Sequence, residues 1–395
     1  MSGFGFHTLA LLVIVGMAGP LLVAVPGLRI PVIIGELVAG LVIGRTGFDI
    51  VDTGDPTFTL LANIGFDLVM FVVGTHVPVR DATLRSGIPK AVLRAVLVGA
   101  VAAALGVVLA RVFGTGHAAL YAVLMASSSA AVALPVIDSL KLDGPQVLSV
   151  KAQIAIADAA SIVLLPLAID PSRAARAALG ALAIAACALV LFFVLRHFER
   201  GGVRTRLREY SKRHELALEL RFSLIMLFSL AALATTTHVS IMLAGFALGL
   251  VINGIGEPKR LARQLLGVSE GFFSPLFFVW LGASLQVRDL GEHPEFIGLG
   301  VGLGVGAVLA HCAARLLGQP LPLGALAAAQ LGVPVAAATL GTERNLLSPG
   351  EPSALILGAL LTIAITSVAG ELFKRRQPVE ASDDAAPEAP EAPAR

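Results

Sequence analysis

The sequence predicts an all-α membrane protein built from two inverted repeats, and three observations support this prediction. Of the 395 residues, 56% are hydrophobic and only 14% are charged, and the mean hydropathy is +0.86; soluble domains carry about 25% charged residues. Apolar runs long enough to cross a bilayer recur along the chain. Short motifs also repeat between the two halves of the chain at a nearly constant offset.

An apolar run of about 20 residues crosses a bilayer as a helix, and several of the runs in this chain are short or rich in glycine. We predict thirteen membrane helices, at residues 5–26, 30–44, 59–78, 88–112, 117–138, 145–168, 174–197, 215–237, 239–254, 265–287, 296–317, 321–341 and 352–373. The membrane domain is therefore expected to cover residues 1–376. The acidic, proline- and alanine-rich segment 377–395 is predicted to be a disordered cytoplasmic tail.

Positive charge is distributed unevenly between the two sides of the predicted membrane domain. Eight of the 29 lysines and arginines lie in one basic linker between Arg196 and Arg221. The side that holds the N-terminus has six, which are Arg45, Arg111, Arg173, Arg176, Arg288 and Arg344. Because cytoplasmic loops are enriched in lysine and arginine, we expect a multi-pass protein of the cell membrane with its N-terminus outside and its C-terminus in the cytoplasm.

Two pairs of motifs indicate an internal repeat. The tetrapeptide Gly-Leu-Val-Ile occurs at 40–43 and again at 249–252, and in the following helices Gly74 matches Gly282. The first matched helices are seven spans apart, which is an odd number, so the second copy crosses the membrane in the opposite sense. We therefore predict repeat one over 5–168, a linker helix over 174–197 and repeat two over 215–373. Inverted repeats of this kind are typical of secondary transporters.

The fifth and twelfth predicted helices contain helix-breaking residues at corresponding places in the two repeats. The fifth holds three consecutive serines and then Pro135, and the twelfth holds Gln330, Gly332 and Pro334. Proline removes an N–H group and clashes with the preceding turn, and the freed carbonyl groups are tolerated in a membrane only where they line a cavity or are buried in protein. Matching interruptions indicate a substrate site near the membrane midplane; ordinary proline kinks are the alternative.

Asp158 is the single acid in the apolar run from Ile154 to Leu165. It lies thirteen residues into its predicted helix, which is about 20 Å from the helix start and therefore near the midplane. A charged side chain at this depth costs about 2.5 kcal/mol or more and marks an ion or proton path. Its carboxyl group could hold either a proton or a monovalent cation, and Ser161 lies on the same helical face. A protonated aspartate bonded to a neighbouring carbonyl group is the alternative.

These motifs together resemble the monovalent cation:proton antiporters of the Kef and NapA type over nearly the whole predicted membrane domain. The segments that carry the resemblance are IPVIIGELVAGLVIG, LANIGFDLVMFVVG, SSSAAVALPVIDSL and IAIADAASIVLL. The resemblance implies a six-helix core domain with two crossed broken helices, which slides like an elevator against a six-helix dimer domain in a homodimer. It also implies that Asp158 carries the proton and the cation, and that Ser128 and Ser129 lie at the unwound crossing.

The sequence departs from this family pattern in two places. Ala157 precedes Asp158, where the family usually has Asp, Asn or Gln, and the lysine of the electrogenic members is missing from the eleventh helix. His311 and Arg315 are the basic residues there, and the alignment leaves open whether either replaces that lysine.

Two further acids, Glu36 and Asp67, lie within predicted spans at positions that are mostly apolar or aromatic in the family. They could line an ion pathway, as could Gln330 and His311. A paired or protonated helix-contact residue is an equally open reading of Glu36 and Asp67.

The sequence therefore predicts a secondary active transporter that exchanges Na⁺ or K⁺ for H⁺, with electroneutral exchange because a single carboxyl group carries both. A channel or an uncoupled carrier of another small solute is the alternative, and a membrane sensor or scaffold that transports nothing is a third class. The chain carries no phosphate-binding loop, metal-ligand pair or nucleophile triad. We thus expect no enzyme activity, no cofactor, no metal beyond the transported cation and no nucleic-acid partner; the expected partners are the cation, the proton, membrane lipid and a second copy.

Overall fold

The computed structural model describes residues 4–24, 32–76, 82–169, 174–200, 216–237, 241–256, 267–285, 288–343 and 345–376, together with 206, 209–211, 213, 214 and 239. Within these ranges the chain is helical and forms no strand. The predicted tail at 377–395 lies outside the described residues, as do Arg173 and Arg344, two of the arginines on which the predicted orientation rests.

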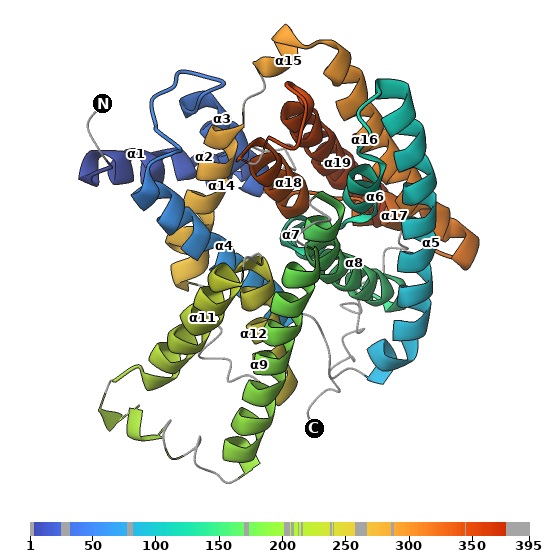
Figure 1. Cartoon of the computed structure of the whole chain (residues 1–395). Helices are drawn as coiled ribbons and strands as arrows, with labels where there is room; N and C mark the ends of the chain where they lie inside the picture. The colour runs from blue at the N-terminus through green and yellow to red at the C-terminus, as the bar shows by residue number, and fades with distance from the viewer. Residues whose placement is uncertain are drawn as a thin grey trace, which may run out of the picture.

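The helices follow one another along the chain as Figure 1 shows. The first half forms α1 (Phe6–Gly16), α2 (Ala18–Val23), α3 (Val32–Ile43), α4 (Pro56–His76), α5 (Ala82–Phe113), α6 (Ala118–Ala126), α7 (Ala130–Ser139) and α8 (Pro145–Ile169). The second half forms α9 (Ala174–Arg200), α11 (Leu218–Thr236), α12 (Ile241–Ile255), the π-helical turn η2 (Ser269–Phe273), α14 (Ser274–Ser284), α15 (Asp289–Glu292), α16 (Glu295–Cys312), the 3₁₀ turn η3 (Ala313–Leu317), α17 (Leu321–Ala327), α18 (Gly332–Glu343) and α19 (Glu351–Lys374).

Helical segments occupy each of the thirteen predicted spans, but not all of them are long enough to cross a bilayer alone. Ten segments of the described chain have the length and apolar composition of a membrane span. The predicted helices 30–44 and 239–254 correspond to α3 and α12, which are shorter apolar helices, and 265–287 corresponds to η2 followed by α14. The chain is therefore a multi-pass membrane protein, and thirteen crossings stay a prediction.

Local sequence signals explain where helix α4 begins. Asp55 accepts hydrogen bonds from the backbone N–H groups of Thr57 (2.8 Å) and Phe58 (3.3 Å), and Pro56 is the first helical residue. An aspartate N-cap satisfies amide groups that have no partner inside the helix. Proline is favoured at the first helical position because its missing N–H is not needed there.

Helices α3 and α14 pack with their backbones in contact. A methyl group added at Gly40 would overlap the carbonyl group of Val279, and one added at Gly282 would overlap the carbonyl group of Leu37. Small residues permit such close approach between membrane helices, where dispersion forces favour tight packing. The two glycines thus fix the distance between these helices.

Helices α4 and α12 pack in the same way, with Gly249 against the carbonyl group of Phe71 and Gly74 against the carbonyl group of Phe246. These contacts repeat those of α3 and α14 at the offset seen in the sequence, because α12 corresponds to α3 and α14 corresponds to α4. The pairs α3–α14 and α4–α12 therefore each join one predicted repeat to the other, in a reciprocal way.

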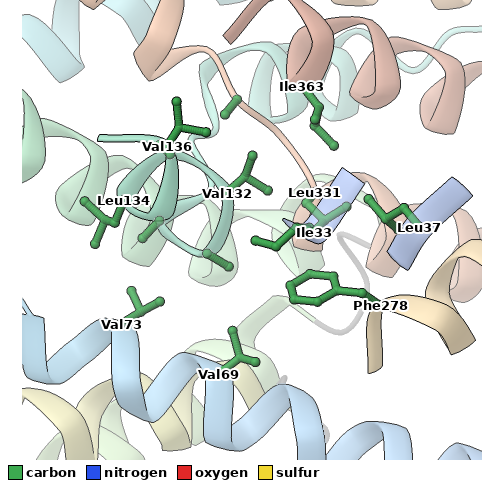
Figure 2. Close-up of a cluster of buried hydrophobic side chains, with 14 of the residues drawn as sticks. Ile33, Leu37, Val69, Val73, Val132, Leu134, Val136, Phe278, Leu331 and Ile363 are labelled. Carbon is green, nitrogen blue, oxygen red and sulfur yellow. The ribbon is translucent and has the colours of Figure 1, made fainter. Parts of the chain in front are cut away.

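Helix α7, which forms the second part of the fifth predicted span, packs against these paired helices through an apolar cluster. Figure 2 shows Val132 of α7 near Ile33 of α3 and Phe278 of α14, with Val69 and Val73 of α4 below it. All five side chains are buried. The contact between α7 and the glycine-packed helices is therefore made by apolar side chains rather than by interlocked backbones.

Gly282→Ala should destabilise the protein, because its added methyl group would overlap the Leu37 carbonyl group. Relieving this overlap requires the backbone of one helix to shift. Overpacking of this kind costs about 1–3 kcal/mol, and we expect a lower midpoint of thermal unfolding in detergent. Gly99→Ala on α5 is the matched control, since a methyl group there meets nothing within 4 Å. Equal melting temperatures for the two variants would contradict the proposed role of the contact.

Candidate functional site

Two broken helices meet near the middle of the chain's helical bundle (Figure 1). Helix α6 ends at Ala126 and α7 begins at Ala130, while α17 ends at Ala327 and α18 begins at Gly332. The backbone N–H of Ser129 donates a 2.7 Å hydrogen bond to the carbonyl oxygen of Ala329. The two unwound segments, which are 200 residues apart in sequence, therefore touch each other directly.

The prolines lie differently from the sequence expectation. The first interruption falls on the three serines, and Pro135 lies inside α7, so the prediction that Pro135 breaks the helix is wrong. A proline removes only its own hydrogen bond to the fourth residue before it, and α7 continues past this loss. Gly332 is the first residue of α18 and Pro334 lies in its first turn, where an N–H group is not needed.

Serine hydroxyl groups bond to carbonyl groups that the breaks leave free. The hydroxyl of Ser128 donates to the carbonyl oxygen of Ala327 at 2.6 Å, across the crossing. The hydroxyl of Ser127 donates to the carbonyl oxygen of Leu124 in its own helix at 2.7 Å. Ser128 thus joins the two broken helices by a side chain, next to the backbone bond of Ser129.

Gln330 is part of the second unwound segment and is buried there. Its side-chain Nε2 donates to the carbonyl oxygen of Leu124 at 2.7 Å, and its backbone N–H donates to Oγ1 of Thr362 on α19 at 3.1 Å. Sequence reasoning missed Thr362. Its only signal was a hydroxyl residue within the apolar run of α19.

Asp158 lies on α8 and reaches the start of α7. Its Oδ2 atom accepts a 3.0 Å hydrogen bond from the backbone N–H of Ala130, the first residue of α7, and the side chain is 6% exposed. The N-terminus of a helix favours a negative charge at this position. Within the described part of the chain, Oδ1 accepts no hydrogen bond, so one carboxyl oxygen has no protein partner.

Ser161 is not directed at that carboxyl group. Its hydroxyl donates to the backbone carbonyl oxygen of Asp158 in its own helix at 2.9 Å, which is a common bond for serine inside helices. The face shared by the two residues therefore does not bring their functional groups together in this structure.

Of the two basic residues left open by the sequence, His311 contacts the crossing, whereas Arg315 is exposed on η3. His311 is fully buried, with Nε2 3.2 Å from Oγ of Ser128 and Nδ1 3.0 Å from the carbonyl oxygen of Ala307. Ser128 has a single hydroxyl proton, and the shorter of its two bonds is the one to Ala327. The Ser128 hydroxyl therefore lies between His311 and the second broken helix.

Glu36 and Asp67 are also buried, but they lie on helices that are not part of the crossing of the broken helices. Glu36 of α3 packs against Gly19 of α2, and Asp67 of α4 lies over Gly245 of α12. Both carboxyl oxygens of Asp67 are buried, and the Gly245 backbone lies close to Oδ1. Neither acid shares a hydrogen bond or ion pair with the crossing among the residues described, so a pathway role for them stays a prediction.

A helical membrane protein with two crossed, broken helices and an acid at their contact has the architecture of a secondary transporter. Residues 9–374 match the model of the family described as the sodium/hydrogen exchanger, transmembrane. The match covers most of the chain, and the chain therefore belongs to this family.

Individual relatives agree with this assignment. The chain is 24% identical to a candidate Na⁺/H⁺ antiporter of Bacillus subtilis, YjbQ, over 96% of this chain and 65% of the relative. It is 25% identical to the Na⁺/H⁺ antiporter NhaS5 of Synechocystis over 88% of this chain and 51% of that protein. The chain thus spans between half and two thirds of the length of these two relatives.

A solved structure has the same fold. The sodium proton antiporter MjNhaP1 of Methanocaldococcus jannaschii superposes with a TM-score of 0.70, covering 95% of this chain and 98% of that chain at 16% identity. A second structure of the same protein, at pH 8, gives a TM-score of 0.65 and covers 94% and 97% of the two chains. At this identity the likeness establishes the arrangement of the helices.

Ser128→Ala should loosen the crossing, because it leaves the Ala327 carbonyl group without its 2.6 Å partner. A buried polar group left without a partner costs about 1–3 kcal/mol. We expect a lower thermal midpoint and faster amide hydrogen exchange at 328–331. Ser127→Ala is the matched control, since its hydroxyl bonds only within α6; equal exchange at 328–331 in both variants would contradict a bridging role.

Proposed function

We propose that this chain exchanges Na⁺ or K⁺ for H⁺ across the membrane, with Asp158 as the shared carrier. The observation that carries the proposal is the position of Asp158: it is a buried acid with one unbonded oxygen at the contact of two broken helices. Membership of the sodium/hydrogen exchanger family and the names of the relatives support the proposal.

The chemistry of the crossing suits a small monovalent cation. Carbonyl oxygens can replace the hydration shell of such an ion, and a carboxylate supplies the balancing charge. In the proposed cycle the cation binds to Asp158 with oxygen atoms of Ser128 and Ser129, and the proton binds to the same carboxyl group after the cation has left. Ser161 could join the cation site only if its hydroxyl rotated away from the carbonyl oxygen that it now contacts.

Movement by an elevator mechanism is the proposed route of alternating access. The core domain would hold α5–α8 and α16–α19, and the dimer domain would hold the other six predicted spans of the two repeats, which are α1–α2, α3, α4, α11, α12 and η2–α14. The apolar cluster between α7 and the dimer domain supports this proposal (Figure 2), because packed apolar surfaces can slide in small steps. The reciprocal glycine contacts support the proposed inverted repeats.

We further propose a homodimer in the cell membrane, with the N-terminus outside and the C-terminus in the cytoplasm. The uneven distribution of lysine and arginine supports the orientation. The dimer is proposed from the family resemblance. The glycines of α3 and α12 do not add support, since they pack against other helices of the same chain.

Asp158→Asn should abolish cation-driven proton movement, because an amide can neither release a proton nor balance a cation. The measurement is proton flux in proteoliposomes after addition of Na⁺, K⁺ or Li⁺, which also identifies the cation. Asp138→Asn is the matched control on α7, since that acid is exposed and paired with Lys151.

Two outcomes would contradict this account. Exchange that survives in Asp158→Asn would place the carrier elsewhere, with Glu36 and Asp67 as the first candidates. Cation flux without proton flux in the unaltered protein would favour the alternative function, which is a channel or an uncoupled carrier.

Exchange should be electroneutral, because one carboxyl group with Ala157 beside it holds one proton or one cation at a time. We expect the exchange rate in proteoliposomes to stay constant when the membrane potential is clamped at different values. A rate or direction that follows the imposed voltage would show that more than one charge is carried per cycle, and would require a second titrating group.

A further inference from the structure

We propose that Lys90, Arg94, Ser149 and Gln319 form a binding site for a phosphate-type anion, separate from the crossing. The four residues come from α5, α8 and the turn between η3 and α17. Helix α5 contacts both α8 and η3, and α8 contacts α17 (Figure 1).

Arg94 is the centre of this site. It is 5% exposed, and its guanidinium group donates to Oγ of Ser149 at 2.9 Å and to the carbonyl oxygen of Leu317 at 3.3 Å. Its Nε atom is buried without a hydrogen-bond partner. No carboxylate is among the partners of Arg94 in the described chain. Lys151, two residues after Ser149 on α8, pairs with Asp138 of α7.

A buried guanidinium group without a counter-charge is costly. Burial of a charge is tolerated when the charge is paired and its hydrogen-bonding groups are satisfied. Arginine has five N–H donors, and the two bonds seen here go to a neutral hydroxyl and a neutral carbonyl group. A bound anion would supply the missing negative charge.

Gln319 provides the second, independent observation. It is 2% exposed, and neither its side-chain oxygen nor its side-chain nitrogen has a hydrogen-bond partner. It lies two residues after Leu317, whose carbonyl group Arg94 contacts. Between them, Gly318 turns the chain with a φ of 76°, and Nζ of Lys90 lies 3.9 Å from the position that a Cβ of Gly318 would take. The unpaired amide of Gln319 and the positive charge of Lys90 thus belong to, or lie near, the same short turn that Arg94 contacts.

The location of the site favours a phosphate group. Lys90 and Arg94 lie near the start of the α5 span at Ile88, Ser149 is the fifth residue of α8, and Gln319 precedes α17. Arg94 is six residues from Ile88, which is about 9 Å along the helix. Arginine side chains reach the interface from this depth, where lipid headgroups place their phosphates, and basic pockets between helices bind anionic headgroups. Soluble phosphate could reach the same surface from water.

A simpler function for Arg94 is to cap the last turn of η3 through Leu317. Capping accounts for one of its bonds, but it leaves Nε and the amide of Gln319 without partners. The two readings differ in whether an anion stabilises the protein through Arg94, which is a measurement that does not depend on the proposed transport function.

The test measures the thermal unfolding midpoint of the full chain in detergent at constant ionic strength. It compares added phosphatidylglycerol, added phosphatidylcholine and added inorganic phosphate. We expect phosphatidylglycerol to raise the midpoint by several degrees more than phosphatidylcholine, since a ligand that binds the folded state stabilises it. Arg94→Gln should lose this increment, while Arg111→Gln, an exposed arginine in the last turn of α5, should keep it.

The other outcomes are also decisive. An equal increment from inorganic phosphate, again lost in Arg94→Gln, would identify a soluble anion as the ligand. An increment that persists in Arg94→Gln, or no increment in the unaltered protein, would overturn the proposal. If Arg94→Gln does not fold, Gln319→Leu and Lys90→Gln keep the guanidinium group and should each reduce the increment; unchanged increments in both would likewise overturn it.

Discussion

The hydrogen bonding of the backbone at the two helix breaks is the constraint on which the rest of the structure depends. A helix that stops inside a membrane leaves N–H and C=O groups that hydrocarbon cannot satisfy, at several kcal/mol for each group. In this chain each break supplies partners to the other, since the N–H of Ser129 meets the carbonyl group of Ala329 and Gln330 meets that of Leu124. Neither broken helix is therefore satisfied alone, and the two form a single structural unit that would have to move together.

The remaining helices contact this unit in a different way. The pairs α3–α14 and α4–α12 are held by backbones that touch at glycines, as at Gly40 and Gly249, where even a methyl group would overlap a carbonyl group. Such contacts are close backbone packing that leaves no space for a larger side chain. The contact of α7 with these helices consists instead of apolar side chains, such as Val132 against Ile33 and Phe278. The contact of α7 with the glycine-packed helices therefore has few directional bonds, which is compatible with the sliding movement proposed above.

Hydrophobic runs were sufficient to predict where the helices lie, because burial in lipid imposes a strong and regular pattern on composition. The serines marked the first break correctly, whereas Pro135 did not, because a helix can lose one hydrogen bond at a proline and continue. What the sequence could not supply was the pairing of distant groups. The bond of Gln330 to Thr362, the orientation of His311 toward Ser128 and the unpaired amide of Gln319 depend on how helices meet in space, and no local pattern encodes them.

The charge balance at Asp158 links this geometry to exchange. In the described chain no lysine or arginine bonds to its carboxyl group, and His311 bonds to Ser128 rather than to Asp158. The N-terminus of α7, through Ala130, supplies only a partial positive charge, equivalent to about half a unit. An ionised Asp158 therefore keeps a net negative charge inside the membrane, where charges are costly. Within the proposed function, the carboxyl group can cross between the two sides at low cost only when a proton or a cation occupies it. That requirement would turn competition for one acid into coupled exchange.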